Sequence, residues 1–177
     1  MNMIWYWGKK IVEKCNQAFT AYDTALTFSH ASNILYDLFN KSLQTLEYKD
    51  FGLIIPFMVN CSFASELFLK ALIGFPQRGH KLGELFKYLL TTDAQIANSI
   101  KDSVLKSFNN SDKPLANSFE EELASVERTF EQFRYGHEPN SVDPHSYNYL
   151  FILIFMNLLE AHAEIKFGKR PVQNDTV

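Results

Sequence analysis

The densest group of residues that could carry chemistry is one short segment, Phe133-Arg134-Tyr135-Gly136-His137-Glu138. The guanidinium of Arg134 can bind a phosphate through two hydrogen bonds, and the imidazole of His137 can transfer protons. Glu138 adds a carboxylate, and Tyr135 offers a ring on which a base could stack. A structural role fits as well, because cations are favoured at a helix C-terminus and Gly136 is a natural left-handed stop. The residues alone leave both interpretations open.

A second group lies on a predicted helix, where Ser62, Glu66 and Lys70 follow one another at intervals of four residues. This spacing puts them in one polar row, and Glu66 precedes Lys70 in the favourable order for an ion pair. The row is either a partly solvated stripe with a surface pair or a pair that lines a cleft. His80 stands just before the next predicted helix, where it could act as an acid or base or make a local hydrogen bond.

Other signatures of chemistry are missing from the sequence. The glycines are scattered rather than gathered into a phosphate-binding loop, and no nucleophile elbow or His-Glu-x-x-His motif occurs. The spacing of His137, Glu138, Asp143 and His145 matches no metal-binding template. We therefore expect neither a metal nor a cofactor.

The elements that must position these residues are helices, because apolar residues recur at helical spacing almost throughout the chain. The predicted helices cover residues 9–21, 23–46, 56–73, 82–90, 93–108, 118–135 and 144–167. Asp23 is the predicted cap of the second helix, and either Thr92 or Asp93 caps the fifth. Ser118 and Glu121 form a capping-box pattern, and Asp143-Pro144 has the cap-then-proline order that opens a helix.

Two of the predicted helices have informative apolar faces. The stripe of the second consists of Leu26, Ile34, Leu35, Leu38 and Phe39. The last helix is apolar almost all round between Tyr149 and Leu159, which predicts a central position or a subunit interface.

Composition sets the class of protein. The chain has 177 residues, of which 46% are apolar and 15% aromatic, with a net charge of −3. These values fit one globular domain over residues 1–177, with its core at about 23–167, and exclude disorder and a global basic field.

The N-terminus lacks the charge order of a signal peptide, and the longest apolar run, Tyr149 to Met156, falls far short of the ~20 residues that cross a bilayer. We expect a cytoplasmic protein without membrane contact, and its two cysteines fit a reducing compartment.

Two parts of the sequence resemble a known family. The first consists of Phe63-Ala64-Ser65-Glu66-Leu67-Phe68-Leu69-Lys70-Ala71-Leu72 and the later Gly79-His80-Lys81-Leu82 with Leu85. It is similar to the "A-x-E-x-x-x-K-A-L … H-x-L-x-x-L" core of HEPN-like helical domains. The second, Phe133-Arg134-Tyr135-x-x-Glu138, is similar to a terminal block in uncharacterised bacterial members. Together the two parts span roughly residues 55 to 165.

The resemblance implies an all-α, up-and-down bundle of about five to seven helices, often a homodimer. The family includes metal-independent RNases of toxin–antitoxin and antiviral systems as well as catalytically silent members. In active members an arginine and a histidine with four to six residues between them meet across the dimer, and RNA is cut by its own 2′-hydroxyl. Arg134 and His137 have only two residues between them, so cleavage stays open.

We therefore expect a homodimer that binds RNA or nucleotide phosphates through Arg134 and His137, the candidate catalytic pair. The further candidate binding residues are Glu66, Lys70, His80, Tyr135 and Glu138. A cognate antitoxin or nucleotidyltransferase is the partner that the resemblance implies. The alternative is a non-catalytic homodimeric interaction module, in which the Glu66–Lys70 pair and the Phe133-Arg134-Tyr135 block are structural.

Overall fold

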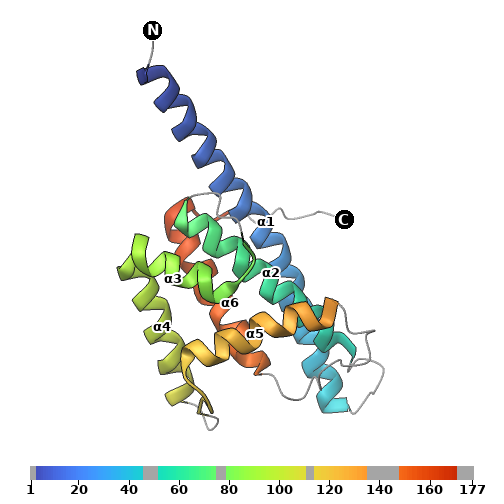
Figure 1. Ribbon diagram of the computed structural model, residues 1–177. Coiled ribbons are helices and arrows are strands. Elements are labelled where there is room, and N and C mark those ends of the chain that lie inside the picture. Colours follow the sequence, from blue (N-terminus) through green and yellow to red (C-terminus); the bar gives the residue numbers. More distant parts are fainter. Residues whose placement is uncertain (1–2, 46–51, 75–78, 111–113, 135–147, 171–177) are drawn as a thin grey trace, which may run out of the picture.

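The computed structural model describes residues 3–45, 52–74, 79–110, 114–134 and 148–170 (Figure 1). In these ranges the chain forms six α-helices and no strand. They are α1 (Met3–Thr45), α2 (Ile54–Ile73), α3 (Leu82–Thr92), α4 (Ala94–Asn109), α5 (Phe119–Arg134) and α6 (Tyr149–Phe167). The prediction of an all-α helical bundle is confirmed.

The N-terminal part of the chain is one helix of 43 residues, so the prediction of two helices divided at Asp23 is wrong. No glycine or proline lies near the expected break, and Thr24 there donates to the carbonyl of Thr20 at 2.9 Å, within the helix. Asp23 does not cap a helix; it pairs with Arg170 at 2.8 Å. The N-terminal end of α1 extends beyond the rest of the bundle (Figure 1).

The face that α1 turns to the bundle differs from the predicted stripe. Phe39 is buried and Leu26 and Leu35 are partly buried, but Ile34 and Leu38 are 48% and 43% exposed. The buried face instead contains three serines, Ser29, Ser32 and Ser42. Ser32 and Ser42 donate to carbonyls of their own helix, each at 2.7 Å, which satisfies their hydroxyl protons. A hydrophobic pattern does not register such small polar residues, which is why the predicted stripe was misplaced.

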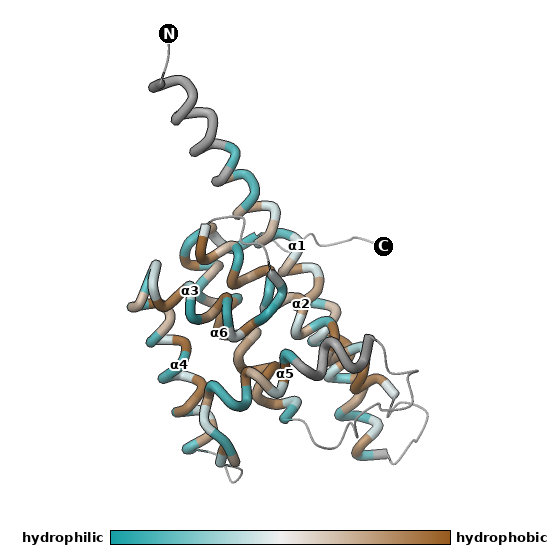
Figure 2. The backbone as a smooth tube through the Cα atoms, viewed as in Figure 1, coloured by the Kyte–Doolittle hydropathy of each residue, from teal (hydrophilic) through white to brown (hydrophobic). Residues whose placement is uncertain are grey.

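Two helices form the centre of the bundle. Helix α2 packs against α1, α3, α5 and α6, and α6 packs against α1, α2, α4 and α5. The hydrophobic residues gather where these helices meet (Figure 2). The predicted central position of α6 is confirmed by its buried residues Phe151, Ile152, Leu153, Phe155, Met156, Leu159 and Ala163. Rings from three helices meet there, because Phe119 of α5 lies 5.0 Å from Phe86 of α3 and 5.6 Å from Phe151 of α6, measured between centroids.

One described helix, α2, is long and apolar enough to cross a membrane by length and composition. In its most apolar window, 56% is buried inside the bundle. This burial fits a core helix of a soluble protein, in which the apolar faces are covered by neighbouring helices.

Local signals fix most helix ends as predicted. Gly74 ends α2 with a left-handed φ of 75°, and Asp93 accepts a hydrogen bond from the amide of Ile96 at 3.1 Å to cap α4. The capping box is present, since Ser118 N donates to Glu121 at 2.9 Å and Glu121 N donates to Ser118 Oγ at 3.3 Å.

The last helix starts later than predicted. Its N-cap is Asn148, which accepts from the amide of Phe151 at 3.1 Å, and not Asp143. Asparagine is as good a cap as aspartate, so cap preference alone does not fix where this helix begins. Residue 143 lies outside the described residues.

Candidate functional site

The candidate site is built around Glu66, which lies on α2 and is only 3% exposed. One carboxylate oxygen, Oε1, accepts hydrogen bonds from two side chains. Lys70 Nζ lies 2.7 Å away, one helical turn further along α2, and His80 Nδ1 lies 2.9 Å away. A carboxylate buried in the bundle thus accepts hydrogen bonds from two nitrogen-bearing side chains that lie nearer the surface.

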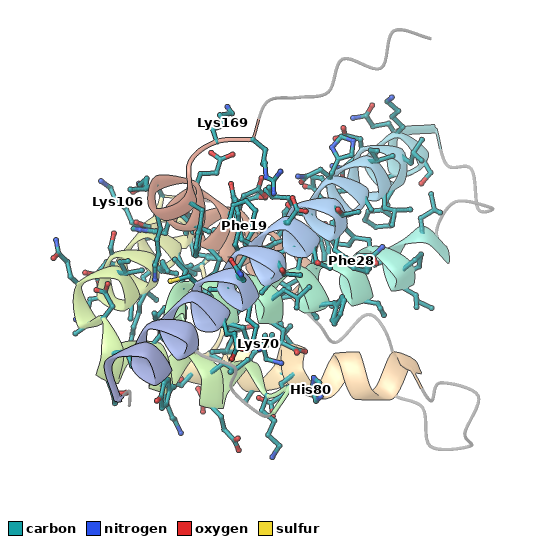
Figure 3. The ribbon with its side chains drawn as sticks, turned by 90° about the horizontal axis from the view of Figure 1, so that it is seen from above. Phe19, Phe28, Lys70, His80, Lys106 and Lys169 are labelled. Atoms are coloured by element: carbon teal, nitrogen blue, oxygen red, sulfur yellow. The ribbon has the colours of Figure 1, made fainter. Side chains whose placement is uncertain are left out.

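The three side chains form a gradient of exposure from the core to the surface. The Glu66 side chain is 4% exposed, that of Lys70 19% and that of His80 76%. Lys70 and His80 lie on one side of the bundle and Lys169 on the opposite side (Figure 3). The interpretation of Glu66 and Lys70 as a solvated surface pair is therefore wrong, because the carboxylate is withdrawn from water and depends on these two partners.

Two buried hydroxyls lie beside Glu66 on the same helix. Ser62 and Ser65 are 4% and 0% exposed, and neither Oγ has a hydrogen-bond partner within the described parts of the chain. A buried hydroxyl without a partner costs free energy, so this stretch of α2 holds more polar groups than stability alone would favour.

The position of His80 is set by the start of α3. Residues 79–81 lead into α3, and Gly79 has a φ of 124°, which favours glycine because it has no Cβ. Glu127 of α5 reaches this point and accepts a hydrogen bond from the amide of Gly83 at 3.2 Å. A carboxylate at a helix N-terminus satisfies a free amide and is favoured by the helix dipole. Sequence analysis missed Glu127, since its partner is 44 residues away.

The remaining candidate residues lie at or beyond the end of α5. Arg134 is the last residue of that helix. It follows Glu127 by seven residues, which corresponds to about 10 Å along the helix axis. Its side chain, and all of Tyr135, His137 and Glu138, lie outside the described residues. Of the predicted site residues, the structure brings together Glu66, Lys70 and His80.

A second carboxylate, also missed by sequence analysis, lies between α1 and α6. Glu160 of α6 accepts a short hydrogen bond from the hydroxyl of Ser29 on α1. Burial raises the pKa of Glu160 above its ordinary value, and the neighbouring Glu164 raises it further, whereas the Ser29 hydrogen bond acts in the opposite direction. About two helical turns before Ser29 on α1, Tyr22 is fully buried and donates to the carbonyl of Gly168 at 2.9 Å. This cluster holds α1 against the end of α6.

Comparison with known proteins adds no relative to this description. No family model, no curated protein and no solved structure matches the chain.

Proposed function

We propose that this chain is a HEPN-like helical-bundle protein that binds RNA or nucleotide phosphates. The proposed binding face consists of the second half of α2, residues 79–81 and the α5 helix. The observation that carries the proposal is the convergence of Lys70 and His80 on the buried Glu66 carboxylate. These are residues of the segments that resemble the family, and they come together from separate parts of the chain.

This face carries both cations and carboxylates, since Lys70 pairs with Glu66 at 2.7 Å and Lys81 lies 3.7 Å from Glu84. His80 and Lys81 are 76% and 56% exposed, and Lys70 is partly exposed beside them. Because the chain as a whole has a net charge of −3, binding of an anion must depend on local nitrogen donors such as those of His80 and Lys81. We further propose that Arg134 and His137 extend this face from the end of α5, and that a homodimer or a cognate antitoxin or nucleotidyltransferase completes the assembly.

Binding of a fluorescently labelled single-stranded RNA, followed by anisotropy over a series of salt concentrations, tests the proposal. We expect salt-sensitive binding that Arg134→Ala and Lys81→Ala each weaken, with little change in thermal stability. Lys106→Ala is the matched control, because Lys106 is an exposed lysine of α4 away from this face (Figure 3). Wild-type protein that leaves the anisotropy unchanged at low salt would contradict the proposal.

The proposal includes metal-independent cleavage of RNA as a second stage. Incubation with total RNA in the presence of a chelator tests it, with His137→Ala as the comparison. RNA that stays intact at micromolar protein would limit the function to binding.

A second candidate function, a non-catalytic homodimeric interaction module, is favoured by α1. Ile34 and Leu38 are one helical turn apart on α1, and each is more than 40% exposed. In this case Glu66 and Lys70 only stabilise the fold. Sedimentation of the Ile34→Glu/Leu38→Glu double variant tests the module, because the double substitution should convert a dimer into a monomer. In this case neither the wild type nor the variant should bind RNA. A wild-type protein that sediments as a monomer at tens of micromolar would exclude it.

A further inference from the structure

The N-terminal part of α1 continues past the helices that cover the rest of it. Ala18 is the first residue of α1 that the structure describes as buried, whereas Glu13 and residues 15–17 are exposed. Residues 3–17 are called the arm; they make about 22 Å of helix, and its N-terminal end extends beyond the bundle (Figure 1). We propose that the arm is an interface to a second copy of the chain, in which two arms pair antiparallel about a two-fold axis at Ile11.

The face of α1 that packs on the bundle continues into the arm. Ala18, Tyr22 and Ala25 are buried in the bundle and follow one another at intervals of four and three residues. Continued toward the N-terminus, spacings of three and four residues reach positions that are all apolar, and these are called the seam: Cys15, Ile11, Trp7 and Ile4. Cys15 is exposed, so the covered face becomes uncovered at the end of the bundle. An apolar seam that has left its partner helices requires another partner in water, since a helix of this length is only marginally stable alone.

The direction of the arm is fixed where it leaves the bundle. The ring centroids of Phe19 and Tyr22 lie 6.4 and 5.1 Å from that of Phe167, the last residue of α6. Tyr22 also donates to the carbonyl of Gly168, and the Arg170 guanidinium lies 4.6 Å from the Phe19 ring. A helix held in this way presents its arm in one orientation, which reduces the entropy that is lost when a partner binds.

The side of α1 on which the seam lies selects the kind of partner. Three lysines of the arm, Lys9, Lys10 and Lys14, would suit an anionic membrane as well as a protein surface. The bundle, however, lies on the same side of α1 as the seam, because Ala18 and Tyr22 are buried in it. A flat membrane would therefore meet the bundle before it reached the seam. A second copy, turned end for end, can lie beyond the end of the bundle and cover the seam.

The seam is complementary to itself when two copies run antiparallel. Its N-terminal half has the large residues Ile4 and Trp7, and its C-terminal half has the small residue Cys15. With Ile11 of both copies at the two-fold axis, Trp7 of each copy is level with Cys15 of the other, so a large residue meets a small one. Ile4 is then level with Ala18 of the second copy, where the bundle begins. Both arms are covered by the same surface used twice, as a closed dimer requires.

Sedimentation of two single variants tests the arm as an interface. Ile11→Glu puts a charge from each copy at the two-fold axis, so we expect a dimer to become a monomer. Tyr6→Glu is the matched control, because residue 6 lies about 140° around the helix from residue 11 and should leave the dimer intact. Circular dichroism of both variants establishes that the bundle is folded.

Tryptophan fluorescence reports on the arm alone, because Trp5 and Trp7 are the two tryptophans of the chain. Dilution of the wild-type protein until it sediments as a monomer should shift the emission to longer wavelength, since pairing removes these rings from water. Ile11→Glu should have the long-wavelength emission at every concentration.

The outcomes distinguish this interface from other surfaces and from the proposed function. A wild-type protein that is a monomer at hundreds of micromolar overturns the inference. A dimer that Ile11→Glu leaves intact, or that dissociates without a change in tryptophan emission, also overturns it and assigns the contact to another surface, such as that of Ile34 and Leu38. A monomer whose emission shifts only with anionic lipid vesicles would assign the arm to a membrane instead. Failure of the wild-type protein to bind RNA would remove the proposed function and leave this inference standing.

Discussion

Two carboxylates lie at contacts within this bundle, and their surroundings differ. Nitrogen donors surround Glu66, whereas Glu160 has a hydroxyl and another acid beside it. Glu66 on α2 accepts hydrogen bonds from Lys70 and His80, so its charge is met by nitrogen donors. Glu160 on α6 receives a hydroxyl from Ser29 and has another acid, Glu164, one helical turn away. Burial raises the pKa of Glu160, which means that its environment disfavours the charged form.

The difference shows which of the two contacts suits a functional site. The Glu66 contact ends at an exposed imidazole, whereas the Glu160 contact ends at a serine that is 1% exposed. A carboxylate whose charge is compensated in the core, and which also holds an exposed side chain, can influence a ligand through that side chain. The charge of Glu160, which is half-buried between α1 and α6 and lies near Glu164, bears on the stability of the bundle.

The largest expected effect comes from Lys70→Met, which keeps most of the length of the side chain and removes its charge. Glu66 would remain buried with His80 as its only described partner, so we expect a loss of about 3 kcal/mol in the free energy of unfolding. Urea denaturation followed by circular dichroism measures it.

The matched control is Lys169→Met, at an exposed lysine whose charge lowers the pKa of Glu160. This change should cost only a few tenths of a kcal/mol, because a solvent-screened charge contributes little. Equal losses in the two variants would mean that the two carboxylates do not differ in the way their charges are compensated.

An intermediate effect is expected from Glu127→Ala. The amide of Gly83 would lose its acceptor at the start of α3, which should cost about 1 kcal/mol. Because this contact holds the segment that carries His80 and Lys81, the proposed RNA binding should weaken in the same variant. Glu127→Gln retains an acceptor oxygen and should recover most of the stability. Hydrogen exchange at the first turn of α3 that stays unchanged in Glu127→Ala would show that the contact does not hold this segment.

The parts of the structure that could be predicted from sequence are those that depend on residues close to one another in the chain. The helix ends at Gly74 and Ser118 were predicted correctly, and the cap of α4 was narrowed to Thr92 or Asp93, because each end depends on residues within one helical turn. The Glu66–Lys70 pair was found for the same reason. The continuity of α1 through Asp23 was missed, because a residue that can cap a helix is also tolerated inside one when tertiary contacts hold it.

The long-range part of the site had no local signal. That His80 turns back onto Glu66 depends on how the chain between α2 and α3 returns to the bundle. The contacts of Glu127 with Gly83 and of Ser29 with Glu160 join residues that are 44 and 131 positions apart. Periodicity identifies the face of a helix but not the residue that this face will meet.

The smallest effect, opposite in sign to the first, is expected from Glu160→Gln. The amide oxygen can still accept from Ser29, and the charge that burial disfavours is gone, so the variant should be more stable than the wild type by a few tenths of a kcal/mol at pH 7. The folded-state pKa of Glu160 lies above its ordinary value of 4.5, so the folded state holds this proton more tightly than the unfolded state. Its contribution therefore falls as the pH rises through that folded-state pKa, and the advantage of the glutamine disappears below about pH 4.5, where the carboxyl is neutral in both states. Urea denaturation of both proteins at a series of pH values measures this difference; an advantage that grows as the pH is lowered would contradict the unfavourable burial of Glu160, and with it the contrast between the two carboxylates.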